Sequence, residues 1–324
     1  MIYYFIPAHN EASWGIGMLY QHVNLLKRNG FDATVVHEKN SVQMDWLDVD
    51  VPAISMQADS FKPNQRDFLV IPEVCANNPV FSELTCRKLV FVQGSFLMLP
   101  NLNEHENYKT LGFEHALVIL PHMKTIVENH FGVPASVVPP FVAPYFFLDK
   151  DALINGTRKR RIIIYPKAGY IDAGLPDYEI VNRFLRRRLA LVNKTSLKWE
   201  LKELRNLTHM ETAQLMQDSA YFINLNSLEG FNTTVPEAMA AGCIPVCYDA
   251  FGGRDFLQDG FNAHVFPNHY AYPLLEKVFE LIDRYDQMRE ENLEIRKQAR
   301  ATASQYTAGH TERALLNFYR MLIT

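Results

Sequence analysis

Short apolar runs alternate with longer amphipathic stretches along most of the chain. Runs such as 2–7 and 68–71 are rich in Ile, Val, Phe and Tyr, which is typical of buried strands. Stretches such as 18–28 place apolar residues at the spacing of one helix face. Strands that alternate with helices in this way predict a parallel sheet in an α/β fold.

The alternation occurs twice, on either side of a polar stretch at 149–161 that contains Asn-Gly and is typical of a linker. The first half has expected strands at 2–7, 33–36, 68–71, 89–93, 116–120 and 136–138, and expected helices at 18–28 and 122–131. The second half has expected strands at 162–165, 197–201, 221–225, 244–247 and 263–266, expected helices at 177–191 and 209–218, and a charged helical region at 271–304. We therefore expect two domains, 1–148 and 149–308, followed by a helical segment at 309–324.

Composition narrows the class of protein. A length of 324 residues fits two domains better than one, and a net charge of -4 argues against a nucleic-acid partner. No apolar stretch approaches the ~20 residues of a membrane span, and the N-terminus lacks the basic lead of a signal peptide. The cysteines show no zinc spacing, so we expect reduced thiols and a cytoplasmic chain, with peripheral membrane contact left open. They are Cys75, Cys86, Cys243 and Cys247.

One segment, EGFNTTVPEAMAAGCIPV at 229–246, carries more candidate chemistry than the rest. Thr233 and Thr234 are natural N-caps, Pro236 is tolerated in a first helical turn, and Gly242 is a natural helix end. With the apolar runs on either side, the segment predicts a strand, a loop, a short helix and a second strand. The loop then leaves the carboxyl end of a parallel strand, where such sheets bind ligands, and the helix start suits a phosphate group.

Two carboxylates, Glu229 and Glu237, flank this expected phosphate site. Carboxylates beside a phosphate site are useful when the ligand also carries hydroxyls, as a nucleotide-sugar does. A simpler interpretation stays open for each residue. Thr234 and Glu237 have the spacing of a capping box, in which the glutamate only closes the first turn. Glu229 would then be an ordinary surface residue of an exposed loop.

The same residues resemble the E-x7-E signature of retaining glycosyltransferases with the GT-B fold, which has two Rossmann-like domains. The resemblance is strongest to family 4, also called glycosyl transferases group 1. The chain departs from the pattern at Asn232, where a second glycine is usual. The matching positions are Glu229, Gly230, Phe231, Glu237, Ala238, Met239, Ala240, Gly242, Pro245 and Val246.

This resemblance implies an enzyme, a hexosyltransferase, that moves a sugar from a nucleotide-diphospho-sugar to a hydroxyl of a glycan or small molecule. Glu237 would hold the ribose hydroxyls and Glu229 would face the transferring sugar. In this family the leaving phosphate is thought to take the acceptor proton, and the last helix, 309–324, crosses back to the first domain. The donor-binding set would further include Gly230, Phe231, Asn232, Thr233 and Thr234.

The resemblance also assigns residues outside the motif. Lys167 follows the expected strand 162–165 and matches the second member of a basic pair beside the diphosphate, with catalytic and donor-binding roles; its alternative is a solvated loop lysine. Arg183 and Arg254 are candidates for the missing arginine of that pair. Gly15 and Gly17 match a loop that meets acceptor or diphosphate, or they form a tight turn without a ligand.

Other chemistry-bearing residues have simpler interpretations. Asp48-Val49-Asp50 spells the D-x-D of metal-dependent transferases, but it lies among polar residues, so we interpret it as surface and expect no cofactor and no obligate metal. His9 and His122 are candidates beside the reacting sugar, against a structural role. Gly252-Gly253 resembles a family turn that precedes an acid, here Asp255.

Two rival functions remain from the sequence. A sugar phosphorylase or nucleotide-sugar hydrolase on the same fold would use phosphate or water in place of a sugar acceptor. A non-catalytic nucleotide-sugar-binding protein would bind the donor without turnover, and Asn232 with the incomplete basic pair keeps that reading open.

Overall fold

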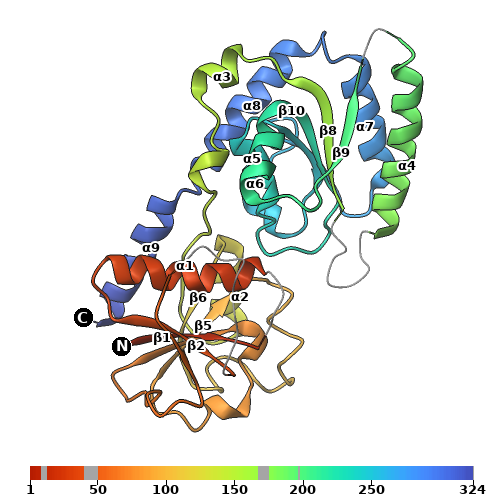
Figure 1. Cartoon of the computed structure of the whole chain (residues 1–324). Coiled ribbons are helices and arrows are strands. Elements are labelled where there is room, and N and C mark those ends of the chain that lie inside the picture. The colour runs from red at the N-terminus through yellow and green to blue at the C-terminus, as the bar shows by residue number, and fades with distance from the viewer. Residues whose placement is uncertain (9–12, 40–49, 167–174, 196–197, 324) are drawn as a thin grey trace. The chain divides into compact units, whose positions relative to one another are not determined.

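The computed structural model describes residues 1–8, 13–39, 50–166, 175–195 and 198–323. They form two α/β units (Figure 1). The first unit contains residues 1–140 together with 309–324, and the second contains residues 141–308. The chain thus leaves the first unit after Pro140, where the sequence suggested a boundary after residue 148, and the segment after 308 belongs with the first unit.

The first unit is built on a seven-stranded parallel sheet with the order β3-β2-β1-β4-β5-β6-β7. β1 pairs with both β2 and β4, so the strand order reverses there. β3 was not predicted, because it has three residues and is partly exposed. The strands are β1 Ile2–Ile6, β2 Ala33–His37, β3 Ala53–Ser55, β4 Phe68–Pro72, β5 Arg87–Val92, β6 Phe113–Val118 and β7 Ala135–Val137.

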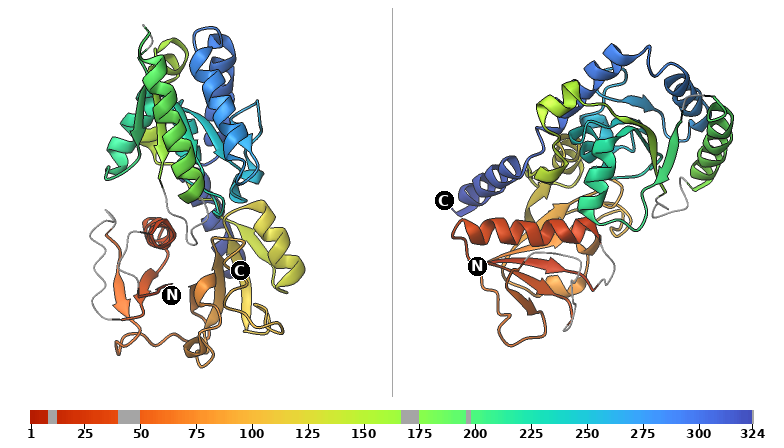
Figure 2. Two further views of the ribbon diagram at one scale, coloured as in Figure 1. Left: turned by 90° about the vertical axis from the view of Figure 1, so that its right-hand side faces the viewer. Right: turned by 45° about the horizontal axis from the view of Figure 1, so that its top comes forward.

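Helices cover this sheet. Figure 2 shows α1 (Trp14–Arg28) lying across the sheet, where it packs on β1 and β2, while α2 (Pro121–His130) packs on β6 and β7. α9 (Ala308–Ile323) is hydrogen-bonded into the unit through Tyr319, whose hydroxyl donates to that of Tyr4 at 3.0 Å.

The start of α1 corrects the expectation for two glycines. Gly15 and Gly17 lie inside the first turns of the helix and not in the loop before it. Ile16, Met18 and Leu19 are all buried. Their burial outweighs the low helix propensity of the two glycines, which is about 1 kcal/mol each relative to alanine.

The second unit is built on a five-stranded parallel sheet with the order β12-β11-β10-β8-β9. β10 pairs with β8 on one side and β11 on the other, so the order reverses between β8 and β10. The strands are β8 Lys159–Tyr165, β9 Glu200–Glu203, β10 Ser219–Asn224, β11 Ile244–Tyr248 and β12 His264–Phe266. The Rossmann-like α/β prediction is therefore confirmed for both units.

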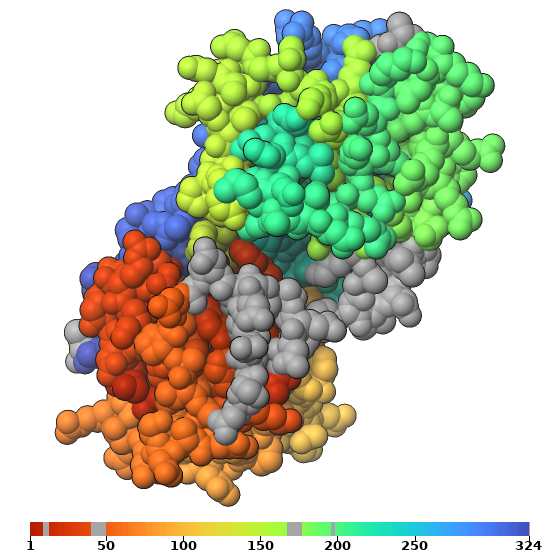
Figure 3. Space-filling view, viewed as in Figure 1, coloured from red at the N-terminus to blue at the C-terminus, as the bar shows by residue number. Residues whose placement is uncertain are grey.

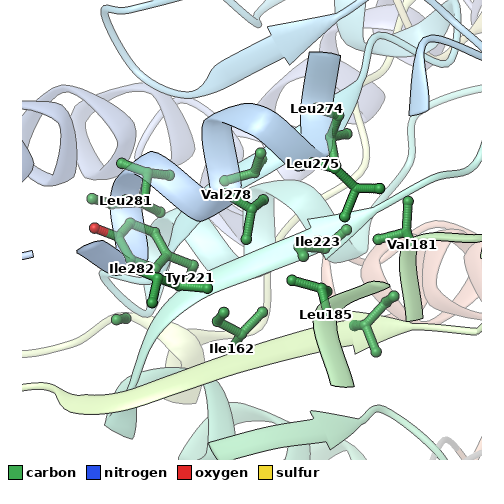
Figure 4. Packing of buried hydrophobic residues seen from close by; sticks show 14 of the residues in the cluster. Ile162, Val181, Leu185, Tyr221, Ile223, Leu274, Leu275, Val278, Leu281 and Ile282 are labelled. Carbon is green, nitrogen blue, oxygen red and sulfur yellow. The ribbon is translucent and has the colours of Figure 1, made fainter. Parts of the chain in front are cut away.

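The core of this unit lies between the sheet and two helices, α4 (Leu175–Val192) and α7 (Ala271–Asp283). Figure 4 shows alternate residues of β10, Tyr221 and Ile223, pointing toward Val278 and Leu281 of α7. α4 forms part of the visible surface of the unit, in green in Figure 3. α5 (His209–Asp218) and α6 (Thr234–Ala240) pack on other residues of the same strands, and α8 (Arg289–Ala303) packs beside α6.

The expected linker at 149–161 is only partly correct. It contains α3 (Lys150–Asn155), which Asp149 caps by accepting from the N–H of Asp151 at 2.8 Å, and β8 already begins at Lys159. The buried side chain of Leu153 gives this polar stretch its one apolar anchor. The charged region 271–304 is likewise two helices, α7 and α8, and not one.

The four cysteines are free thiols. Burial raises the pKa of the Cys243 thiol to about 12, so it acts as a small apolar side chain. In the described ranges, no helix has the length and apolar character needed to cross a membrane.

Candidate active site

The second sheet has its reversal point between β8 and β10, and open α/β sheets bind ligands beside the carboxyl ends of strands at such a point. β10 ends at Asn224, and the loop that follows carries Glu229 and leads into α6. β8 ends at Tyr165. Lys167, two residues further on, lies outside the described residues, so its predicted role stays a prediction.

A buried amide ties the two ends of this loop together. Nδ2 of Asn224 donates to Oδ1 of Asn232 and to Oγ1 of Thr234, both at 2.9 Å. Its Oδ1 accepts from the backbone N–H of Asn226 at 2.9 Å. One fully buried side chain therefore fixes the loop both where it leaves β10 and where it enters α6.

Asn232, which stands where the resembling pattern has a second glycine, has a backbone conformation that suits glycine. Its φ is +58°, in the left-handed region that glycine adopts freely and that asparagine tolerates better than most residues. The substitution is thus compatible with the sharp turn this position makes. Nδ2 of Asn232 is buried and has no hydrogen-bond partner within the described part of the chain.

Glu229 is held by a second loop, which follows β11. Its N–H donates to the carbonyl of Ala250 at 3.0 Å, and its own carbonyl accepts from the N–H of Gly252 at 3.1 Å. Its carboxylate Oε1 accepts from Nδ2 of Asn226 at 3.2 Å. Ala250 and Phe251 both have positive φ values, of 50° and 64°, a strained conformation that persists only when neighbouring structure enforces it.

The predicted turn Gly252-Gly253 is therefore the segment that holds Glu229. Asp255, two residues on, is exposed. Arg254 follows the turn and pairs with Asp249 at 2.9 Å. The other candidate for the basic pair, Arg183, extends from α4 toward Glu179 with 80% of its side chain exposed. Of the two arginines, Arg254 is the one next to the turn that holds Glu229.

The capping-box interpretation of Glu237 is wrong. Thr233 occupies the N-cap position of α6 but has helical backbone angles, and its side chain makes no capping hydrogen bond. The hydroxyl of Thr234 contacts Asn224 and Asn232 instead. The Glu237 carboxylate, which would close the first turn in a capping box, forms its hydrogen bond with another helix.

That partner is His209, the first residue of α5. Nε2 of His209 lies 2.7 Å from Oε1 of Glu237, and Nδ1 lies 2.5 Å from the hydroxyl of Tyr145. Glu237 is 3% exposed. Burial raises the pKa of its carboxyl group, while the hydrogen bond and charge of His209 act to lower it. The charge of Glu237 adds to burial in raising the pKa of Tyr145.

His209 and Tyr145 were not among the residues predicted from the sequence. The histidine is 28 residues before Glu237, and no short motif joins them. A signal for its position was present, because Thr208 and Glu211 form the capping box of α5 and so make His209 the first helical residue. Nothing in the sequence, however, indicated that α5 starts beside α6.

The reversal point of the first sheet carries a different arrangement. Glu73 follows β4 and is buried, and its Oε1 accepts from the N–H groups of Gln93 and Gly94, both at 2.8 Å. Nε2 of Gln93 donates to the carbonyl of Gly15 at 2.9 Å. Gly15 is therefore a close-packing position, where a Cβ would lie 2.4 Å from Oε1 of Gln93. Gly17 lies one turn into α1 and is buried.

His9 and Asp48 lie outside the described residues. His122 is half-buried near the start of α2, in the first unit. Among the residues that the structure describes, no group of three His, Cys, Asp or Glu side chains has the arrangement of a metal site.

Part of the second unit is similar in sequence to a known enzyme family. Residues 188–302 match the family model described as "Glycosyl transferases group 1", a segment that includes α5, β10, α6 and β11. The fold is similar to that of solved GT-B glycosyltransferase structures. The chain is a glycosyltransferase with the GT-B fold. No curated protein matches its sequence.

The similarity of this glycosyltransferase to solved structures extends over its whole length. A glycosyltransferase from Rickettsia africae has a TM-score of 0.70 and 15% identity, covering 100% of this chain and 98% of its own. Sucrose-phosphate synthase from Thermosynechococcus elongatus has a TM-score of 0.69 and 12% identity, and the match covers 99% of this chain and 98% of the synthase. The Anabaena protein HepE, solved with UDP, has a TM-score of 0.62 and 11% identity, and the match covers 99% of each chain. At these identities the likeness concerns the fold.

Proposed function

We propose that this glycosyltransferase moves a hexosyl group, with retention of anomeric configuration, from a nucleotide-diphospho-sugar to a hydroxyl of a glycan or small molecule. The donor binds beside the carboxyl ends of β8 and β10. Glu237 accepts hydrogen bonds from the ribose hydroxyls, and Glu229 faces the transferring sugar.

The observation that supports the proposal most strongly is the burial of the Glu237 carboxylate. A carboxylate that is almost fully buried beside the reversal point of a sheet is costly unless it has a task there. His209 occupies Oε1, and Oε2 makes no hydrogen bond to the described residues. An ionised Oε2 accepts hydrogen bonds only, which suits a ligand that presents hydroxyl groups.

The transfer exchanges one bond for another. The bond between the anomeric carbon and the diphosphate oxygen breaks, and a bond from that carbon to the acceptor oxygen forms on the same face of the sugar. The acceptor proton passes to the leaving phosphate. Lys167 and the backbone N–H groups near Thr233 and Thr234 stabilise the charge that develops on the diphosphate. No metal takes part, so turnover is insensitive to EDTA.

Other predicted residues belong to the loop between β10 and α6 and stabilise its conformation. Gly230 and Phe231 connect Glu229 to Asn232, and the ring of Phe231 packs against Tyr306 with centroids 4.8 Å apart. Backbone groups from Phe231 to Thr233 contact the sugar. Gly15 and Gly17, at the start of α1, keep their predicted role toward the acceptor or the diphosphate.

The first experiment is thermal unfolding with UDP, GDP, ADP and their sugar conjugates, on the wild type and Glu237→Ala. A ligand that binds only the folded protein raises Tm by mass action. At a hundredfold excess over Kd, the free energy of unfolding rises by about 2.7 kcal/mol. We expect a shift with one base that Glu237→Ala loses. Glu179→Ala, which removes an exposed carboxylate of α4, is the control and keeps the shift.

The identified donor then serves to test the chemistry. NMR of the new glycosidic linkage should show the anomeric configuration of the donor. An inverted product would refute retention. Donor binding without turnover on a broad acceptor panel would instead favour the non-catalytic binding protein, and release of free sugar or sugar phosphate would favour the hydrolase or phosphorylase.

A further inference from the structure

We propose that His209 is a positioning residue for the donor site: it orients the Glu237 carboxylate and keeps it negatively charged, so that donor affinity is maintained at mildly acidic pH. This inference rests on the proposed function, since it assigns Glu237 to the donor.

The direction of the hydrogen bonds follows from the chemistry of the three groups. An ionised carboxylate can only accept, so Nε2 of His209 carries the proton and donates to Oε1 of Glu237. Nδ1 of the neutral ring is then an acceptor, and the hydroxyl of Tyr145 donates to it. When the ring is protonated, Nδ1–H donates to the tyrosine oxygen instead, and the bond to Glu237 becomes an ion pair.

The histidine ring is held from several sides. Its edge packs against Phe146, with ring centroids 4.8 Å apart, and against Tyr145, at 5.5 Å. Nε2 of Gln217, at the other end of α5, donates to the backbone carbonyl of Tyr145 at 2.9 Å. The capping box of α5 fixes the backbone of His209 itself. The ring therefore reaches Glu237 in one orientation, which fixes Oε1 and leaves Oε2 for the ligand.

The charge of Glu237 depends on few other groups. Burial favours the neutral acid, and His209 from α5 opposes it, while Tyr145 from the turn before α3 interacts with the carboxylate. The titratable and charged groups on the remaining elements around α6 interact elsewhere. Cys243 before β11 lies near Arg158 and Arg296, Tyr221 of β10 lies near Arg296 of α8, and Cys247 of β11 lies near Asp249 and Asp259.

Removing the ring should therefore leave a buried carboxyl group with nothing to favour its ionised form. A carboxyl group that stays protonated at pH 6 offers a hydroxyl donor where the ribose needs an acceptor. His209→Phe keeps an aromatic ring against Phe146 but deletes both nitrogens. His209→Gln keeps a donor that can reach Oε1. The two variants separate loss of packing from loss of the hydrogen bond.

The test measures Kd between pH 5.5 and 8.5 by calorimetry, using the nucleoside diphosphate that stabilises the wild type. We expect His209→Phe to bind roughly tenfold more weakly than the wild type at pH 6 and to approach the wild type at pH 8.5, where the carboxyl group is ionised in both proteins. His209→Gln should recover most of the affinity at pH 6. His130→Gln, at an exposed histidine of α2, is the control and changes nothing. An equal loss at every pH, or no loss, overturns the proposal.

A second measurement works without any nucleotide. In protein labelled with ¹³C at glutamate side chains, Glu237→Gln identifies the Glu237 signal, and its titration is followed in the wild type and His209→Phe. A higher Glu237 pKa in the variant is expected, and an unchanged pKa refutes the role of His209. If that pKa rises but no nucleotide binds the wild type, the donor assignment fails while the coupling between the two residues stands.

Discussion

Gly252 approaches the backbone of Gly230 so closely that a Cβ on Gly252 would lie 2.0 Å from the Gly230 carbonyl oxygen. Through this contact, the loop after β11 packs against the loop that carries Glu229. A methyl group there meets backbone atoms, which cannot rotate away as the end of a side chain can. The glycine is therefore required by space, whatever its backbone angles.

We predict that Gly252→Ala lowers the free energy of unfolding by about 1–3 kcal/mol, the usual cost of forcing an extra carbon into packed structure. It should also weaken donor binding, because the Glu229 loop must move. Urea denaturation and calorimetry measure the two effects. Gly309→Ala is the control, since its new Cβ would lie 3.6 Å from its nearest neighbour in α9. A Gly252→Ala protein as stable as the control would show that the loop adapts.

Asn232 and Asn206 form a matched pair, because both have positive φ, of 58° and 54°. Only Asn232 is buried and accepts from Nδ2 of Asn224. Glycine adopts a positive φ at either position without strain. The difference in the free energy of unfolding between the two variants therefore measures the contacts of the Asn232 amide. We expect Asn232→Gly to cost about 1–3 kcal/mol more than Asn206→Gly in urea denaturation, as Asn224 loses a buried partner. Equal effects would contradict this role for the Asn232 amide.

Burial raises the pKa of Glu73 from 4.5 to about 7, against the opposing effect of the N–H groups of Gln93 and Gly94. The folded protein holds this proton more tightly than the unfolded chain does. Its contribution to stability is therefore complete below pH 4.5 and is lost as the pH rises through about 7, by roughly 3 kcal/mol in all.

Glu73→Gln removes this titration and keeps an oxygen that can accept from both N–H groups. We predict that the stability of the variant relative to the wild type increases by roughly 2–3 kcal/mol between pH 5 and pH 8. Chemical denaturation across that range measures it, and contributions from other groups cancel in the comparison. Glu83→Gln, at an exposed glutamate of the same unit, should give a curve parallel to the wild type. A parallel curve for Glu73→Gln would rule the prediction out.

Tyr319 of α9 and Tyr4 of β1 are both fully buried, and their hydroxyl groups are 3.0 Å apart. Tyr319→Phe deletes the donor and leaves the Tyr4 oxygen with His22 at 3.4 Å. We expect a loss of about 1 kcal/mol, the usual net value of such a hydrogen bond. Tyr272→Phe, at an exposed tyrosine of α7, should cost nothing in the same denaturation assay.

The strand–loop–helix–strand segment from β10 to β11 was predicted well, because neighbouring residues in the sequence determine each of its elements. An apolar strand, a loop with glycine, a run of helix formers and Gly242 follow one another within one segment, and each favours the structure found. Four of the seven residues of α6, Glu237 to Ala240, are good helix formers. The α/β class followed from the same alternation repeated along the chain.

What the sequence could not show were contacts between distant elements. His209 reaches Glu237 only because α5 and α6 lie side by side, and Gln93 contacts Gly15 only because the first sheet brings β5 near α1. The capping box of Thr234 and Glu237, left open as an alternative, fits the spacing but is wrong, because Thr234 already lies inside α6 and its hydroxyl contacts Asn224 and Asn232. Gly15 and Gly17 suggested a loop, but the buried residues between and after them decided for helix.

The position of α9 also bears on synthesis. The first unit takes its last helix from residues 309–324, which the ribosome makes only after the complete second unit. Until then, the sheet that starts the chain lacks Tyr319 and the apolar residues beside it, while the second unit already has all its strands. Domains generally fold as units during translation. In this protein the half that is translated first therefore cannot complete its fold until α9 has been made.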